Sequence, residues 1–111
     1  MAGHCLVARE DEAGGFLIFN THFFECAFIS LVIVSPSKRR RGVASRLIES
    51  LIEMSPTSKV FSSTNRSNHT MQHVFDACGF KPSGIVENLD EGDPELIYFK
   101  SAEPMIKDEE F

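Results

Sequence analysis

One stretch constrains the fold more than any other: an apolar strand that leads into a very basic turn and then into a helix. Residues 27–34 read Ala-Phe-Ile-Ser-Leu-Val-Ile-Val, with one polar side chain among eight, which is typical of a buried strand. Four consecutive cations, Lys38–Arg41, follow and precede Gly42. Beyond the glycine, apolar residues recur near helical spacing, at Val43, Leu47, Ile48, Leu51, Ile52 and Met54. A helix N-terminus attracts anions through its unpaired N–H groups, and glycine lets a phosphate approach the backbone. The stretch therefore predicts a site for a phosphate-bearing ligand.

The distribution of charge narrows the class of ligand. The chain has a formal net charge of −5, yet five of its eleven Lys and Arg residues lie between Lys38 and Arg46. Nucleic-acid binding usually needs a broad basic face, whereas this is one compact basic turn in an acidic chain. The neighbouring predicted strands also lack the interleaved aromatic and basic residues of nucleic-acid platforms. We therefore expect a small polyanion as ligand and no nucleic-acid partner.

The length of 111 residues predicts one domain over residues 1–100 and an acidic C-terminal tail over residues 101–111. No run approaches the roughly 18 apolar residues that span a bilayer, and the N-terminus lacks the basic and apolar regions of a secretory signal. We therefore expect no membrane partner and a cytoplasmic location.

The cysteines and histidines do not predict a metal site. Cys5, Cys26 and Cys78 are odd in number and lack paired metal spacing, so we expect reduced thiols. His69 and His73 are four residues apart on a predicted helix, but no acidic partner joins them at motif spacing. No metal is expected.

The order of elements is predicted from the periodicity and the turn residues. We expect strands over residues 4–9, 15–20, 25–34, 59–64, 84–89 and 95–100, and helices over residues 42–54 and 69–78. The polar residues Asn20–His22 are interpreted as a turn, Pro56 as the stop of the first helix, and Gly79 as the residue just past the second helix. The strands that flank the first helix should be parallel, as in a strand–helix–strand crossover.

Two motifs resemble those of a known family. The spacing Arg39-x-x-Gly42-x-Ala44, preceded by Val34-x-Pro36, resembles the acetyl-coenzyme A signature of the GNAT family of N-acetyltransferases. The later segment from Asn68 to the Gly79-Phe80 pair resembles the family's second conserved helix, and the two elements occur in the family's order and separation. The resemblance covers about residues 26–100. It implies an α/β (α+β) fold in which a mixed, mostly antiparallel sheet is flanked by two main helices.

The resemblance implies an N-acetyltransferase that transfers the acetyl group of acetyl-coenzyme A to the amine of a small molecule or protein by direct attack. A second interpretation is a catalytically weak or inactive module that binds coenzyme A or acyl-coenzyme A as a sensor or partner subunit. The residues that the resemblance implies at the cofactor are Leu31, Val32, Ile33 and Val34 for the pantetheine arm, Arg39, Arg40, Arg41, Gly42, Val43, Ala44 and Ser45 for the pyrophosphate, and Asn68 and Phe75 on the second helix.

The sequence departs from the family at the catalytic positions. The family's frequent tyrosine acid falls at Phe75, and the strand glutamate that some members use as a base falls at Phe28. The remaining candidates are Glu25, acting as a base through water, and Tyr98, acting as an acid. A hairpin glutamate and a packed tyrosine are the alternative interpretations of these two residues.

The family usually has one more strand and one or two helices before the first hairpin, and here only about three residues precede it. The first strand, near Cys5–Arg9, is then expected to form a sheet edge, and Phe16, Phe19, Phe23 and Phe24 are expected to be exposed. Both features predict a homodimer in which the second copy completes the wall of the acceptor pocket.

Overall fold

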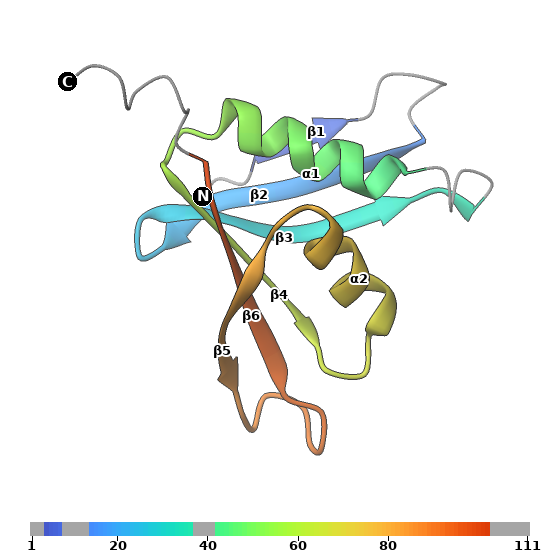
Figure 1. Ribbon diagram of the computed structural model, residues 1–111, viewed down its shortest axis with the longest axis vertical. Coiled ribbons are helices and arrows are strands. Elements are labelled where there is room, and N and C mark those ends of the chain that lie inside the picture. Colours follow the sequence, from blue (N-terminus) through green and yellow to red (C-terminus); the bar gives the residue numbers. More distant parts are fainter. Residues whose placement is uncertain (1–3, 8–13, 37–41, 103–111) are drawn as a thin grey trace.

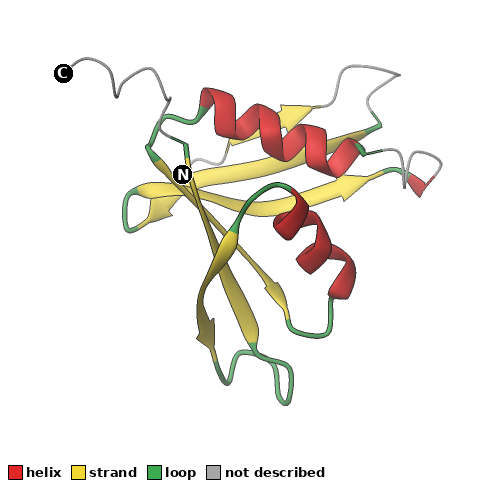
Figure 2. Ribbon diagram, viewed as in Figure 1, coloured by secondary structure: helices red, strands yellow, loops and turns green. Residues whose placement is uncertain are grey.

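The structure is a computed structural model that describes residues 4–7, 14–36 and 42–102. It contains a single six-stranded sheet in the order β1-β2-β3-β4-β6-β5 and two helices (Figures 1 and 2). The elements are β1 (His4–Val7), β2 (Gly15–Phe23), β3 (Cys26–Val34), α1 (Val43–Met54), β4 (Lys59–Asn65), α2 (His69–Ala77), β5 (Lys81–Val86) and β6 (Glu95–Ser101). All pairings are antiparallel except β3 with β4, which is parallel, so the expected mixed sheet and crossover are confirmed.

Both helices pack on one face of the sheet. The buried face of α1 is made by Val43, Leu47, Ile48 and Leu51, as the helical spacing predicts. These residues share one core with residues of the strands and of the segment around α2: Leu17, Phe19, Ala27, Ile29, Val60, Phe75, Cys78, Phe80 and Tyr98. Phe16 and Ile18 face away from this core, as alternation along a strand requires.

The opposite face of the sheet carries a row of phenylalanines. Phe23 stacks on Phe28 with ring centroids 4.9 Å apart, and Phe61 lies 5.0 Å from Phe23 and 5.3 Å from Phe99. These four residues come from four adjacent strands. None of the helices in the described part of the chain covers them.

The expected turn at Asn20–His22 is wrong. β2 continues to Phe23, and the chain reverses at Phe24 and Glu25, whose φ angles are 52° and 64°. A two-residue hairpin turn of type I′ needs positive φ at both positions. The longer strand is favoured because it brings the Phe23 ring into the aromatic row, and this gain overrides the turn preference of the polar residues.

The expected range of the fifth strand is also wrong. β5 begins at Lys81 and ends at Val86, so it includes Pro82 and leaves out the 65% exposed Leu89. β5 is the edge strand, where a proline without an N–H costs no ladder hydrogen bond, and a register shift between Pro82 and Gly84 accommodates it.

The helix ends follow the sequence prediction. α1 ends at Met54, before Ser55 and Pro56, and α2 is followed by Gly79 with φ 86°, the left-handed conformation expected after a helix. At the C-terminus, β6 includes Ser101, and residues 103–111 of the predicted tail lie outside the described residues. No helix in the described ranges is long and apolar enough to cross a membrane.

Candidate functional site

The candidate site begins where β3 and β4 separate. Their pairing joins Ala27 to Val60, Phe28 to Phe61 and Ile29 to Ser62, and no further pair is formed toward the C-terminal ends of the two strands within the described ranges. The buried Ser62 hydroxyl donates to the Ile29 carbonyl at 3.0 Å, at the last of these pairs. Beyond it, β3 continues for five residues along β2 without β4 beside it.

A β-bulge lies at the point of divergence. On the β2 side, Phe19 pairs with Ile29 and Ile18 pairs with Leu31, so Ser30 is an extra residue in β3. Bulges bend the strand and increase its twist. The Ser30 hydroxyl accepts a hydrogen bond from Asn20 Nδ2 at 3.2 Å, across the β2–β3 pair. The bulge therefore accounts for the turn of β3 away from β4.

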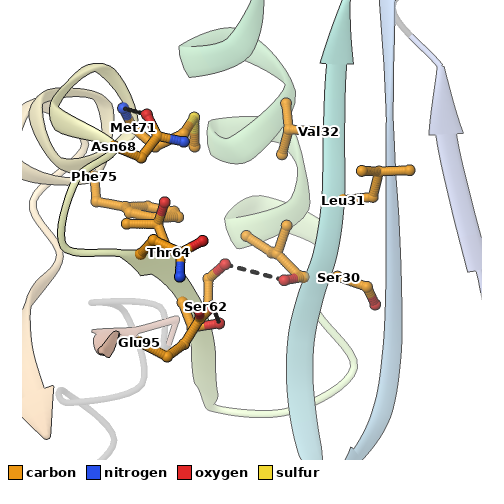
Figure 3. A pocket seen from close by; sticks show the side chains of 12 residues that line it. Ser30, Leu31, Val32, Ser62, Thr64, Asn68, Met71, Phe75 and Glu95 are labelled. Atoms are coloured by element: carbon orange, nitrogen blue, oxygen red, sulfur yellow. Dashed lines mark hydrogen bonds between the residues drawn. The ribbon is translucent and has the colours of Figure 1, made fainter. Parts of the chain in front are cut away.

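The gap between the two strands holds a cavity of about 330 Å³ (Figure 3). One wall is β3, the other is β4, and α2 closes the helix side. The lining residues are Ile29, Ser30, Leu31 and Val32 of β3, Ser62, Ser63, Thr64 and Asn65 of β4, Asn68, Met71 and Phe75 at α2, and Glu95 of β6. The volume is at the lower end of the range for small-molecule sites.

The cavity is lined by residues of both faces of the sheet. Along β4, Ser62 and Thr64 are buried on the helix face, whereas Ser63 and Asn65 point to the opposite face, because successive side chains of a strand alternate. The cavity is lined by all four. A ligand in the cavity can therefore contact residues of both faces of the sheet.

The helix α2 is held at its N-terminus by Asn68, whose side-chain oxygen accepts from the Met71 N–H at 3.1 Å. The loop after β4 is tied to the loop before β6. Asn65 Nδ2 donates to Asp90 at 2.9 Å, and the Ser67 hydroxyl donates to Asp93 at 2.6 Å. These bonds fix the position of α2 relative to the cavity.

The start of α1 lies close to the end of β3 (Figure 1). Gly42 is its N-cap residue with φ 78°, and no side chain caps the helix. Because the first N–H groups of a helix lack intrahelical partners, those of the turn Val43–Ser45 are available to an anion. The predicted site residues Arg39, Arg40 and Arg41 lie outside the described residues.

The predicted cofactor residues fall into two groups. Leu31, Val32, Asn68 and Phe75 line the cavity, whereas Ile33 and Val34 continue β3 beyond it. Gly42, Val43, Ala44 and Ser45 form the start of α1 and are not among the lining residues.

The two predicted catalytic residues lie outside the cavity lining. Glu25 is in the exposed turn before β3, at the end of the strand opposite to the divergence. Tyr98 is buried, and its ring packs on Phe75 at 4.9 Å. Burial raises the pKa of Tyr98, and the negative charge of Asp76 raises it further. Tyr98 therefore keeps its proton at neutral pH.

Cys78 is a further titratable group with a shifted pKa, and the described part of the chain contains no cluster of metal-ligating side chains. Burial raises the pKa of the Cys78 thiol, although its contact with Ser45 lowers it in part. In the described part of the chain, no three His, Cys, Asp or Glu side chains are grouped so as to hold a metal ion.

Sequence reasoning missed the β3 residues Ile29 and Ser30, Met71, Glu95 and the β4 residues Ser62–Asn65. The β4 residues could have been found. The signal was present: four consecutive polar residues end a strand whose first residues are largely apolar, and two of them, Ser62 and Thr64, are buried. Polar residues in a buried strand need partners or a ligand. Glu95 carried no such signal, because a glutamate at a strand start is ordinary.

A family model described as "Acetyltransferase (GNAT) family" matches residues 1–80. The chain belongs to the GNAT acetyltransferase family. The family resemblance of its two motifs and its mixed fold are thereby confirmed.

Solved structures agree with this assignment. A GNAT-family acetyltransferase from Bacillus cereus ATCC 10987 is 58% identical to this GNAT chain, with a TM-score of 0.83. The match covers 87% of this chain and 69% of the Bacillus cereus protein. A GNAT acetyltransferase from Elizabethkingia anophelis with acetyl-CoA bound is 16% identical, with a TM-score of 0.78 over 89% and 76%. The ribosomal-protein-S18-alanine N-acetyltransferase from Escherichia coli is 17% identical, with a TM-score of 0.76 over 92% and 70%. The last two show the shared fold. No curated protein is similar enough to the chain to count as a relative.

Proposed function

We propose that this GNAT chain transfers the acetyl group of acetyl-coenzyme A to an amine acceptor by direct attack. The single observation that carries the proposal is the cavity at the divergence of β3 and β4, whose lining includes residues of both faces of the sheet. Membership of a family of acetyltransferases and the acetyl-CoA-bound relative support the choice of cosubstrate.

The cofactor would lie along β3. The segment Leu31–Val34 has β2 on one side and no β4 pairing on the other, so the amides of a pantetheine arm can pair with it as an added strand does. The pyrophosphate would then reach the start of α1 at Gly42–Ser45, with the arginines 39–41 as countercharges. Asn68 and Phe75 would contact the cofactor from α2.

The reaction follows from this placement. The acceptor amine attacks the thioester carbonyl carbon, the carbon–nitrogen bond forms, the carbon–sulfur bond breaks, and coenzyme A leaves as a thiolate that takes up a proton. Phe75 has no hydroxyl to supply that proton, and it is 1% exposed against the rings of Phe80 and Tyr98. Holding both reactants in the cavity lowers the barrier by proximity, and backbone N–H groups of β3 can polarise the carbonyl.

The experiment is a pair of measurements on the full chain. Calorimetric titration with coenzyme A tests binding, and a thiol reagent measures coenzyme A release from acetyl-coenzyme A in the presence of a panel of amines. We expect binding and amine-dependent release. Binding without release above background would favour the coenzyme A-binding module, and absence of binding would overturn both interpretations.

We also propose a cytoplasmic location. Cys26 and Cys78 are free thiols, as is usual in a reducing compartment. Non-reducing electrophoresis of the protein taken directly from cells, blocked with a thiol reagent, should show reduced cysteines.

A further inference from the structure

The cavity has one ionisable side chain in its lining, as far as the described residues go, and that side chain is Glu95. Glu95 is half-buried at the start of β6 and opposite Asn65 in the β4–β6 register. Its carboxylate accepts a hydrogen bond from the Ser63 hydroxyl at 2.7 Å (Figure 3 shows Glu95 beside β4). The side chain is therefore fixed by a charge-assisted bond at the edge of the cavity.

Glu95 lies on the face of the sheet that is opposite to the helices. Leu96 and Tyr98 pack toward the helices, so Glu95 and Ile97 belong to the opposite face of β6. Ser63 lies on the same face of β4. The proposed cofactor path follows β3 and α1, whereas Glu95 and Ser63 face the side from which the second ligand would enter.

We propose that Glu95 is the general base of the transfer reaction and that Ser63 positions it. This inference rests on the proposed function. An alkylamine is protonated at pH 7, as the lysine side chain is (pKa about 10.4), and an ammonium has no electron pair for attack. Glu95 accepts one proton from the ammonium. The neutral amine then attacks the thioester carbonyl carbon, the carbon–nitrogen bond forms as the carbon–sulfur bond breaks, and the second proton of the attacking nitrogen passes to the leaving thiolate.

The geometry suits this role. An ionised carboxylate offers about four lone-pair sites, and Ser63 uses one of them, so others remain for the ammonium. Asp90 accepts from Asn65 and Asp93 accepts from Ser67, and neither these two carboxylates nor Glu87 and Glu91 are among the residues that line the cavity. Glu95 is thus the carboxylate that lines the cavity and, with one hydrogen bond from Ser63, keeps lone pairs for an ammonium.

The test compares Glu95→Gln with the control Glu53→Gln, a glutamate on the exposed side of α1. The glutamine oxygen can still accept from Ser63, so the variant removes the base and keeps the contact. Two acceptors are used with acetyl-coenzyme A: n-butylamine, an ammonium at pH 7, and methoxyamine, which is neutral at pH 7. Release of coenzyme A is corrected for the reaction without protein.

We expect Glu95→Gln to lower kcat/KM for n-butylamine by about 100-fold, the usual worth of a general base. The loss with methoxyamine should be much smaller, because that amine has no proton to give up before it attacks. The low-pH limb of the n-butylamine profile should change only in Glu95→Gln. Ser63→Ala should keep this limb and lower kcat by about tenfold, the worth of one charged hydrogen bond.

Equal losses with both amines, or activity like that of the parent, would overturn the assignment of Glu95 as a base. A second measurement does not need turnover. In protein labelled with ¹³C at glutamate carboxyls and saturated with coenzyme A, n-butylamine should shift the resonance that Glu95→Gln removes, and the Glu53 resonance should stay. An unshifted Glu95 resonance would contradict the inference, whereas failure to bind coenzyme A would instead refute the proposed function.

Discussion

Two requirements apply to Gly42 at the start of α1: a left-handed backbone conformation and space for the proposed pyrophosphate. Its φ of 78° is a conformation that side chains with a Cβ adopt at a cost, and it stands where the proposed pyrophosphate meets the helix. A substitution therefore tests charge only if the strain is held constant. Asp and Asn tolerate the left-handed conformation about equally and differ in charge.

We expect Gly42→Asp to reduce coenzyme A affinity by about 100-fold or more, since a negative charge at the helix N-terminus repels the pyrophosphate. Gly42→Asn carries the same backbone strain and should lose much less. Calorimetric titration gives both dissociation constants, and circular dichroism checks that the variants are folded. Equal losses in the two variants would show that the phosphates do not bind at Gly42.

The raised pKa of the Cys78 thiol predicts how the stability of the fold changes at alkaline pH. Burial is the largest cause of the raised pKa of its thiol, with the negative charge of Glu49 adding to the effect. The folded state therefore keeps the proton at pH values where the unfolded chain, with its thiol near the ordinary pKa of 9.0, has lost it. The contribution of the protonated Cys78 thiol to the free energy of unfolding is fully present below about pH 9. It is lost as the pH rises toward the folded pKa, by at most about 1.4 kcal/mol for each pH unit.

Urea unfolding of the parent and of Cys78→Ala, in the presence of a reductant, measures this effect. Between pH 8 and pH 10 the free energy of unfolding should fall more steeply in the parent than in Cys78→Ala. Tyr98 contributes in the same direction at higher pH, because its pKa is raised above 10.0. Identical slopes in the two proteins would mean that the thiol is not desolvated.

At the scale of elements, Gly15 marks the point where β2, β3 and α1 meet. A Cβ built at this residue would lie 2.5 Å from the Ile33 carbonyl oxygen and 3.2 Å from both the Val34 Cα and the Val43 Cγ1. The first of these atoms is backbone, so β3 itself would have to move. The same displacement would reach the strand and the helix start that are proposed to hold the cofactor.

Gly15→Ala should therefore lower the free energy of unfolding by about 1–3 kcal/mol, as overpacking usually does, and should weaken coenzyme A binding as well. Gly92→Ala is the matched control. Gly92 has φ 76° with no atom within 4 Å of the place that an added methyl group would take, so this variant has backbone strain without a collision. It should lose stability but keep its affinity for coenzyme A. Unchanged affinity for coenzyme A in Gly15→Ala would show that β3 is not part of the cofactor site.

The sequence predicted elements well where one local signal dominated. α1 and its stop at Pro56 follow from helical spacing and a proline, and β3 follows from an apolar run. Prediction failed where a tertiary contact outweighed a local preference, as at Phe23, whose ring completes an aromatic row built from strands far apart in the chain.

The site was predicted in the same uneven way. Gly42 and Asn68 belong to short motifs, so their places at helix starts follow from neighbouring residues. The pairing of Ser63 with Glu95 spans 32 residues and depends on the β4–β6 register, which no local pattern specifies. The cavity itself arises from a bulge at Ser30, and a single extra residue leaves no mark on hydrophobic alternation over so short a distance.

At the scale of the whole molecule, the uncovered apolar surface bears on assembly. β1 and β5 are the edge strands of the sheet, and Phe24 is 85% exposed. Leu31 and Ile33 are each 42% exposed, and they alternate along β3 with Val32 and Val34, which pack on the core under the helices. The expectation of exposure is wrong for Phe19, which is buried in the core, whereas Phe16 and Phe23 are half-buried.

We predict that the chain forms a homodimer through this helix-free face, because a second copy would remove the exposed side chains from water. Sedimentation velocity at micromolar concentration should show a species of about twice 12.4 kDa. Leu31→Ser combined with Phe24→Ser should shift the equilibrium to the monomer, whereas Met54→Ser, an exposed methionine on α1, should not. A parent protein that sediments as a single species of 12.4 kDa would contradict the prediction.

The short junction between β3 and β4 divides the sheet into two three-stranded units, β1-β2-β3 and β4-β6-β5. Regions joined by few hydrogen bonds can open separately, as cooperative subunits of the native state. A ligand that lies along β3 and touches α2 would connect the two units, and at 100 times its dissociation constant it would add about 2.7 kcal/mol to the stability of the connected state. Amide hydrogen exchange would then report two units of different protection in the apoprotein and a single slowly exchanging unit once the ligand is bound.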